Sequence, residues 1–207
     1  MAGTIADRLR SLLASDVYTT KGRLRADDLL IRERVARSLG EASARLRDLA
    51  SQWRADRVPP STRENPFPPA EVMTPLRQAD RLGKDIDTVA TSVRGLPLMP
   101  EDKVWNRVRR GGLDELLQFD WALVSEADEL AGQLAAAPDL AAIDSAAVAR
   151  QLRRLTEVIA DRRRYVEVIV LASGKASAVG QGARGARGNG GREPPMRESA
   201  VGWRGHG

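Results

Sequence analysis

A heptad pattern of apolar residues runs through a long segment without proline, and it restricts the folds open to this chain. Between residues 25 and 57 the apolar positions alternate in spacing between four and three residues: Val35, Leu39, Ala42, Leu46, Leu49 and Trp53. On an α-helix this spacing forms a narrow apolar stripe, which packs against a neighbouring helix at a shallow angle. We therefore predict a long helix over residues 25–57 that pairs lengthwise with another helix.

A second stripe of this kind lies in the segment that follows Asp139 and Asp144, either of which can cap a helix. Arg162 occupies one place where the spacing would put an apolar residue. Residues 165–171 are rich in β-branched side chains, but no second strand is available for pairing, so we expect them to be helical. We predict a helix that ends near Ser173, with a seam formed by Val148, Leu152, Leu155, Ile159, Val166 and Ile169.

Capping residues and prolines predict the remaining helices. Thr4 and Asp7 resemble a capping box at the start of a helix over residues 4–17. Thr74 and Pro75 suit the start of a helix that a left-handed Gly95 would end. Two further helices are expected over residues 101–110 and 113–137, the second one ended by Pro138.

The composition agrees with helices packed on helices. Alanine supplies 30 residues and leucine 23, whereas Phe, Trp and Tyr together supply eight. A β-sandwich would need more aromatic and β-branched residues. The fold class that we predict is all-α: an elongated helical bundle over residues 1–174 with heptad-type antiparallel helix pairing, followed by a disordered Gly/Arg-rich tail over residues 175–207.

A proline-rich strap separates two of the predicted helices over about residues 58–74. It contains Pro59, Pro60, Pro66, Pro68 and Pro69. Such a segment favours extended, polyproline II-like backbone. Two interpretations stay open: the strap is a ligand for an SH3-type groove, or Phe67 pins it to the bundle.

The inventory of reactive side chains argues against an enzyme. The sequence has no cysteine, and its one histidine, His206, lies in the glycine-rich tail. The chain therefore lacks the residues for a thiolate metal site, a cysteine nucleophile or a Ser–His–acid triad. We expect no catalytic residue, no cofactor, no metal and no small-molecule substrate. No apolar run has the length of a membrane span or a secretory signal, so we expect a cytoplasmic protein.

The positive charge is concentrated at the C-terminal end. Residues 175–207 carry a net charge of +4, and residues 1–174 carry +1. Arginine in a flexible glycine context contacts phosphates and stacks on bases. An alternative function is therefore nucleic-acid binding by the tail and the arginine-rich last helix, with these contact residues: Arg162, Arg163, Arg164, Arg184, Arg187 and Arg192.

Our leading hypothesis is a non-enzymatic scaffold or adaptor protein. It rests on the two heptad seams, which suit protein partners and a homo-oligomer. A second alternative is a peripheral membrane protein that uses the amphipathic N-terminal helix, but this helix has few cations and no aromatic residue on its apolar face. We therefore expect it to pack on the bundle or on a second subunit.

Overall fold

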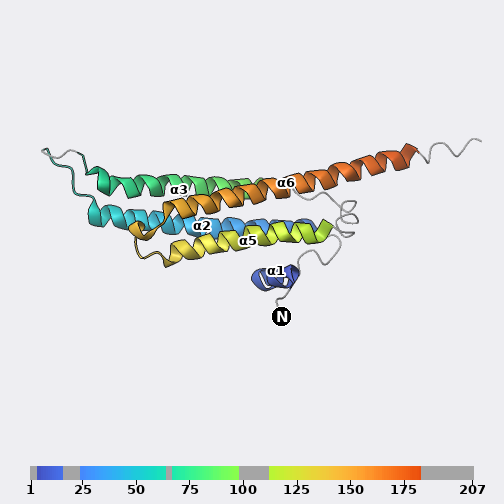
Figure 1. Cartoon of the computed structure of the whole chain (residues 1–207), viewed down its shortest axis with the longest axis horizontal. Helices are drawn as coiled ribbons and strands as arrows, with labels where there is room; N and C mark the ends of the chain where they lie inside the picture. Colours follow the sequence, from blue (N-terminus) through green and yellow to red (C-terminus); the bar gives the residue numbers. More distant parts are fainter. Residues whose placement is uncertain (1–3, 16–23, 64–66, 98–111, 183–207) are drawn as a thin grey trace, which may run out of the picture. The chain divides into compact units, whose positions relative to one another are not determined.

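The structure, a computed structural model, describes residues 4–15, 24–63, 67–97 and 112–182, and none of these residues forms a strand. The all-α prediction is thus confirmed for this part of the chain. The chain divides into two units, residues 1–173 and 174–207. The helices of the structure are α1 (Ile5–Leu13), α2 (Leu24–Arg57), α3 (Ala70–Arg94), α5 (Leu113–Ala136), the 3₁₀ helix η2 (Leu140–Ala142) and α6 (Ser145–Gly182) (Figure 1).

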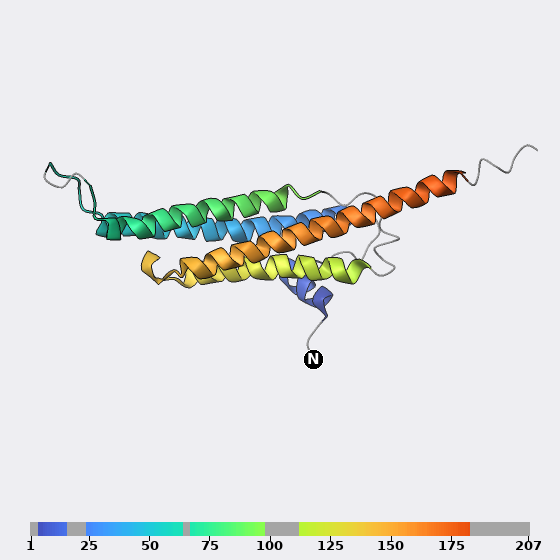
Figure 2. The same cartoon turned by 45° about the horizontal axis from the view of Figure 1, so that its top comes forward.

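Helices α2 and α3 lie side by side and run antiparallel (Figures 1 and 2). Near the start of α2, Arg32 donates through Nη2 to the carbonyl oxygen of Pro97, just after α3, at 2.7 Å. Near the end of α2, Trp53 donates through Nε1 to the carbonyl oxygen of Val72, in the first turn of α3, at 3.0 Å. The strap between these helices covers residues 58–69 and is shorter than expected.

Helix α5 packs against the other side of α2, and these two helices run parallel. Arg34 on α2 pairs with Asp128 on α5, with Nη2 and Oδ2 2.8 Å apart. Further along both helices, Arg45 donates through Nη2 to the carbonyl oxygen of Ala137 at 2.8 Å. The predicted pairing was antiparallel, and this contact is parallel. Heptad spacing alone does not determine the direction of a partner helix.

Helix α6 returns antiparallel to α5 and also lies next to α3. Gln151 donates through Nε2 to the carbonyl oxygen of Glu126 at 3.0 Å. Towards the end of α6 and the start of α5, Nε of Arg162 lies 2.7 Å from Oδ1 of Asp120. Where α6 lies next to α3, Leu152 of α6 and Val89 of α3 line the same shallow groove. Consecutive long helices therefore alternate in direction.

The two predicted seams form part of the core. The seam residues Val35, Leu39, Leu46 and Leu49 of α2 are all 1% exposed or less. The α6 seam residues from Val148 to Val166 are nearly as buried, and Trp53 is half-buried against the same core. The apolar stripes of α3 and α5 complete it with these residues: Leu76, Ala79, Leu82, Ile86, Val89, Val93, Leu116, Leu117, Leu123, Val124, Ala127, Leu130 and Leu134.

Several helix ends form as predicted from the sequence. The capping box of α1 is confirmed, because the Thr4 hydroxyl accepts from the Asp7 amide and the Asp7 carboxylate accepts from the Thr4 amide. Hydrogen bonds that the Thr4 hydroxyl and the Thr4 amide donate to the Asp7 carboxylate lower the pKa of this carboxyl below its usual value. Asp144 accepts from the amides of Ala146 and Ala147 at the start of α6, and Asp139 caps η2.

One predicted helix start and one predicted cap conformation are wrong, although α3 does end at Arg94 with Gly95 as its C-cap. Helix α3 begins before Thr74, because the amides of Val72 and Met73 already donate to the Pro69 carbonyl, and Pro75 lies inside the helix. Gly95 has φ −80° and ψ 1° and is not left-handed. Its amide continues the helical pattern by donating to Thr91.

In the second unit the backbone of α6 remains helical as far as Gly182. The predicted end near Ser173 and the start of a disordered tail at residue 175 are therefore wrong. Residues 175–178 (Lys-Ala-Ser-Ala) include good helix formers, which carry the helix past Gly174. The rest of the predicted tail, residues 183–207, and the predicted helix over residues 101–110 lie outside the described residues.

Candidate functional site

Four buried charged side chains connect α2, α5 and α6: Asp28, Arg32, Asp120 and Arg162. We name them the ionic cluster, and each side chain is 5% exposed or less. Arg162 contacts two carboxylates, with Nη2 2.5 Å from Oδ1 of Asp28 and Nε 2.7 Å from Oδ1 of Asp120. The other oxygen of Asp28, Oδ2, lies 2.5 Å from Nη2 of Arg32. Asp28 is therefore shared between two guanidinium groups.

The ionic cluster also holds the end of α3. Arg32 donates to the carbonyl oxygens of Leu96 and Pro97, which directly follow that helix. Its Nε is buried and has no hydrogen-bond partner in the described part of the chain. Through these contacts the ionic cluster links all four long helices at one level of the bundle.

Arg162 does not lie on the surface predicted for it. It was expected on a nucleic-acid surface, whereas the structure buries it to 1% exposure in the core. The sequence did indicate a buried position, because Arg162 occupies a place in the apolar seam where the spacing calls for an apolar residue. A charged residue at a core position needs an oppositely charged partner, although the sequence does not show which aspartates supply it.

The chemistry of the ionic cluster fits a structural role. A guanidinium stays protonated in proteins and is a poor proton donor. Both oxygens of Asp28 accept hydrogen bonds from arginines, which leaves little room for an incoming ligand. Buried ion pairs contribute less to stability than to fixing which helices meet and in which register. We therefore interpret the cluster as a device that sets the register of α2, α5 and α6.

Two more sets of polar contacts attach α2 to its neighbours near the surface. Ser38 and Arg34, one turn apart, both donate to Asp128 of α5, and the hydrogen bond that Arg34 donates to Asp128 raises the pKa of Arg34. Ser43 and Arg47 likewise both donate to Asp87 of α3. Each contact places a serine and an arginine four residues apart around one aspartate.

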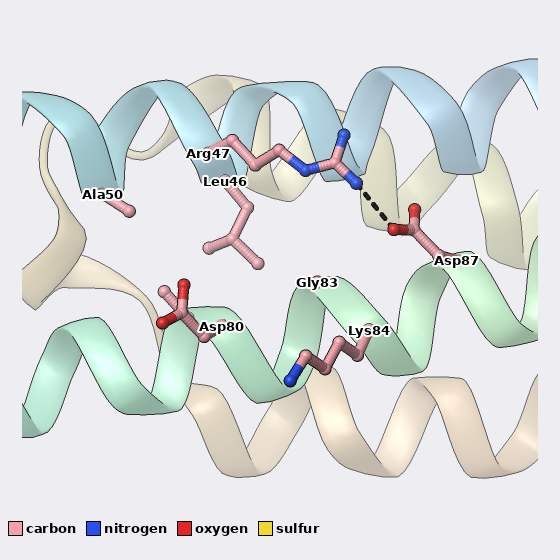
Figure 3. Close-up of a pocket in the computed structure, with 8 residues that line it drawn as sticks. Leu46, Arg47, Ala50, Asp80, Gly83, Lys84 and Asp87 are labelled. Atoms are coloured by element: carbon pink, nitrogen blue, oxygen red, sulfur yellow. Dashed lines mark hydrogen bonds and ion pairs between the residues drawn. The ribbon is translucent and has the colours of Figure 1, made fainter.

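The α2–α3 contact contains a shallow groove with a volume of about 230 Å³. Figure 3 shows Arg47 reaching from α2 towards Asp87 of α3, while Leu46 points between the two helices. Gly83 lies on the opposite wall, and a Cβ added there would meet no atom within 4 Å. The groove carries both signs of charge, because Asp80 and Lys84 line it as well. No feature of it selects one class of ligand.

The strap presents an aromatic side chain to solvent. Phe67 is 85% exposed, and Pro59, Pro60 and Pro69 are also exposed. Phe67 therefore does not pin the strap to the bundle, which was one of the two interpretations left open. Beside the strap, Trp53 joins the end of α2 to the first turn of α3 through its hydrogen bond to Val72.

The N-terminal helix packs on the bundle. Leu9 of α1 is completely buried, and the Arg8 guanidinium lies 5.6 Å from the ring centroid of Trp121 on α5. The apolar face proposed for a membrane thus contacts protein. None of the described helices is long and apolar enough to cross a membrane.

The remaining candidate residues for nucleic-acid contact are in two places. Arg163 and Arg164 are exposed on α6 and pair with Glu167 and Asp161. Arg184, Arg187 and Arg192 lie outside the described residues. Within the described ranges, no group of three or more His, Cys, Asp or Glu side chains is arranged to hold a metal ion.

Comparison with known proteins gives no relative from which a function could be transferred. No family model matches the chain, and no curated protein and no solved structure is significantly similar to it.

Proposed function

We propose that this chain is a non-enzymatic helical adaptor that acts through protein–protein contacts, and that the strap is its contact segment. The observation that carries the proposal is the exposure of Phe67. A phenylalanine at 85% exposure leaves nearly all of its apolar surface in water. Aromatic side chains are enriched at protein interfaces, where burying such a surface supplies much of the binding energy.

The packing of the seams supports the choice of the strap. The seams gave the reason to expect a second copy of the chain, and their described residues, apart from the half-buried Trp53, are buried within one chain. These buried residues have little apolar surface left for another subunit. The proposal is therefore restricted to contacts made by exposed segments with a partner protein.

A photo-crosslinking amino acid placed at position 67 of the full-length chain in its native cells tests the proposal. The matched control carries the same amino acid at position 29, because Leu29 is also an exposed apolar residue, at 48% exposure on α2. We expect a discrete adduct from position 67 that position 29 does not give. The crosslinked protein, once purified, should bind the unmodified chain and bind the Phe67→Ala variant more weakly. Equal adducts from both positions, or none from either, would contradict the proposal.

A further inference from the structure

The segment around Phe67 has the backbone and the side chains of a polyproline II ligand. Phe67 is followed by Pro68 and Pro69, and the other end of the strap carries Pro59 and Pro60. Pro69 has φ −54° and ψ 139°, close to the polyproline II values of about −75° and +145°. The ring of proline fixes φ at Pro68 and Pro69, so these two dihedral angles are set before any partner binds.

We infer that Phe67, Pro68 and Pro69 bind an aromatic-lined, polyproline-binding groove on a partner protein. This inference rests on the proposed function and names the chemistry of the partner. Grooves of the SH3, WW and EVH1 type are lined by aromatic rings and take proline-rich segments in the polyproline II conformation. The exposed Phe67 ring adds an apolar anchor of the kind that dominates the energy of an interface.

The hydrogen bonds between Pro69 and the start of α3 favour binding of this segment to a partner. Beyond Pro69, the amides of Val72 and Met73 donate to its carbonyl oxygen, so the proline pair leads directly into α3. At the other end, the Arg57 guanidinium lies 5.4 Å from the ring centroid of Trp53, whose hydrogen bond to Val72 holds together the two helices that flank the strap. Pro69, which is fixed to α3, loses less conformational entropy when it binds.

The experiment titrates the full-length chain into a panel of purified SH3, WW and EVH1 domains and measures binding by calorimetry. We expect one class of domain to bind, with an affinity that Phe67→Ala lowers about tenfold or more, as for an aromatic anchor. Pro68→Ala should also weaken binding, because it removes a residue with fixed φ. Leu29→Ala is the matched control and should leave the affinity unchanged. Phe67→Ala should keep the melting temperature of the parent, because the side chain is almost entirely exposed.

Several results would overturn the inference. One is the absence of binding by every domain of the panel at roughly millimolar concentration. Another is binding that Phe67→Ala does not weaken. A third is self-association of the chain that depends on Phe67, which light scattering would detect and which would make a second copy the occupant. If the partner crosslinked from position 67 has no aromatic polyproline-binding groove, this inference fails while the proposed function stands.

Discussion

Arg162 and Asp28 are 134 residues apart in the sequence, and their side chains meet in the core with Nη2 and Oδ1 2.5 Å apart. The two residues belong to the last and the first of the four long helices. Asp120, on a third helix, binds Nε of the same guanidinium. A single side chain of α6 therefore connects three helices at one level of the bundle.

Replacing Arg162 with methionine should destabilise the fold by about 3–5 kcal/mol, because it removes a buried cation shared by two buried carboxylates. The matched control is Arg163→Met, one residue further along. Its side chain is 63% exposed and pairs with Glu167 on the same helix, and such surface pairs contribute about 0.3–0.5 kcal/mol. Urea denaturation followed by circular dichroism measures both variants. Equal losses of unfolding free energy would show that burial gives Arg162 no special role.

Replacing Gly83 with alanine should stabilise the protein by about 0.5–1 kcal/mol, because glycine in a helix interior has the larger conformational freedom to lose. The added Cβ would enter the α2–α3 groove and meet no atom within 4 Å. Gly40→Ala is a matched change on α2, where a Cβ also meets nothing. Thermal unfolding should show a gain for each variant and nearly additive gains for both together. A loss confined to Gly83→Ala would mean that the two helices approach more closely at the groove than the structure has them.

Replacing Trp53 with phenylalanine should loosen the contact between the end of α2 and the first turn of α3. It removes the hydrogen bond to the Val72 carbonyl oxygen, and a bond of this kind contributes about 1 kcal/mol. We expect faster hydrogen exchange at the amides of Val72 and Met73. Trp121→Phe is the control, because Trp121 lies on α5 and should leave the exchange of these two amides unchanged. If both variants have the same effect on the two amides, the hydrogen bond of Trp53 does not hold the first turn of α3 against α2.

Tyr165 should make stability depend on alkaline pH. Burial, followed by the negative charge of Glu115, raises the pKa of Tyr165 above its usual 10.0, and its hydroxyl donates to the Gly112 carbonyl oxygen at 2.6 Å. The folded state therefore holds the phenolic proton more tightly than the unfolded state does. This contribution to stability is fully present below pH 10.0 and is lost as the pH rises through the higher pKa of the folded state.

The measurement compares the unfolding free energy of the parent chain with that of Tyr165→Phe at neutral pH and above pH 10. The phenylalanine variant lacks the titrating group and should lose less stability over this range. The two chains share all other titrating groups, whose effects cancel in the difference. Parallel pH profiles would contradict an elevated Tyr165 pKa.

Local patterns in the sequence were enough to predict the helices and much of the core. The capping box of Thr4 and Asp7, the cap at Asp144 and the stop at Pro138 depend on neighbouring residues alone. The heptad seams of residues 35–53 and 148–166 identified buried positions, because a periodic apolar face has to be covered whichever helix covers it. At Gly95 only the backbone conformation differs from the prediction, and the next residue, Leu96, is buried and accepts a hydrogen bond from Arg32.

Only the tertiary structure decided which helices meet and which side chains face water. An apolar stripe does not specify the direction or identity of its partner, so the parallel contact of α2 with α5 was not predictable. The position of Arg162 in the core depends on two aspartates from distant parts of the chain. The exposure of Phe67 likewise depends on whether the bundle offers it a cavity, and the bundle closes its core with its own leucines and valines. Burial is a property of the whole packed structure, whereas helix formation is largely a property of short segments.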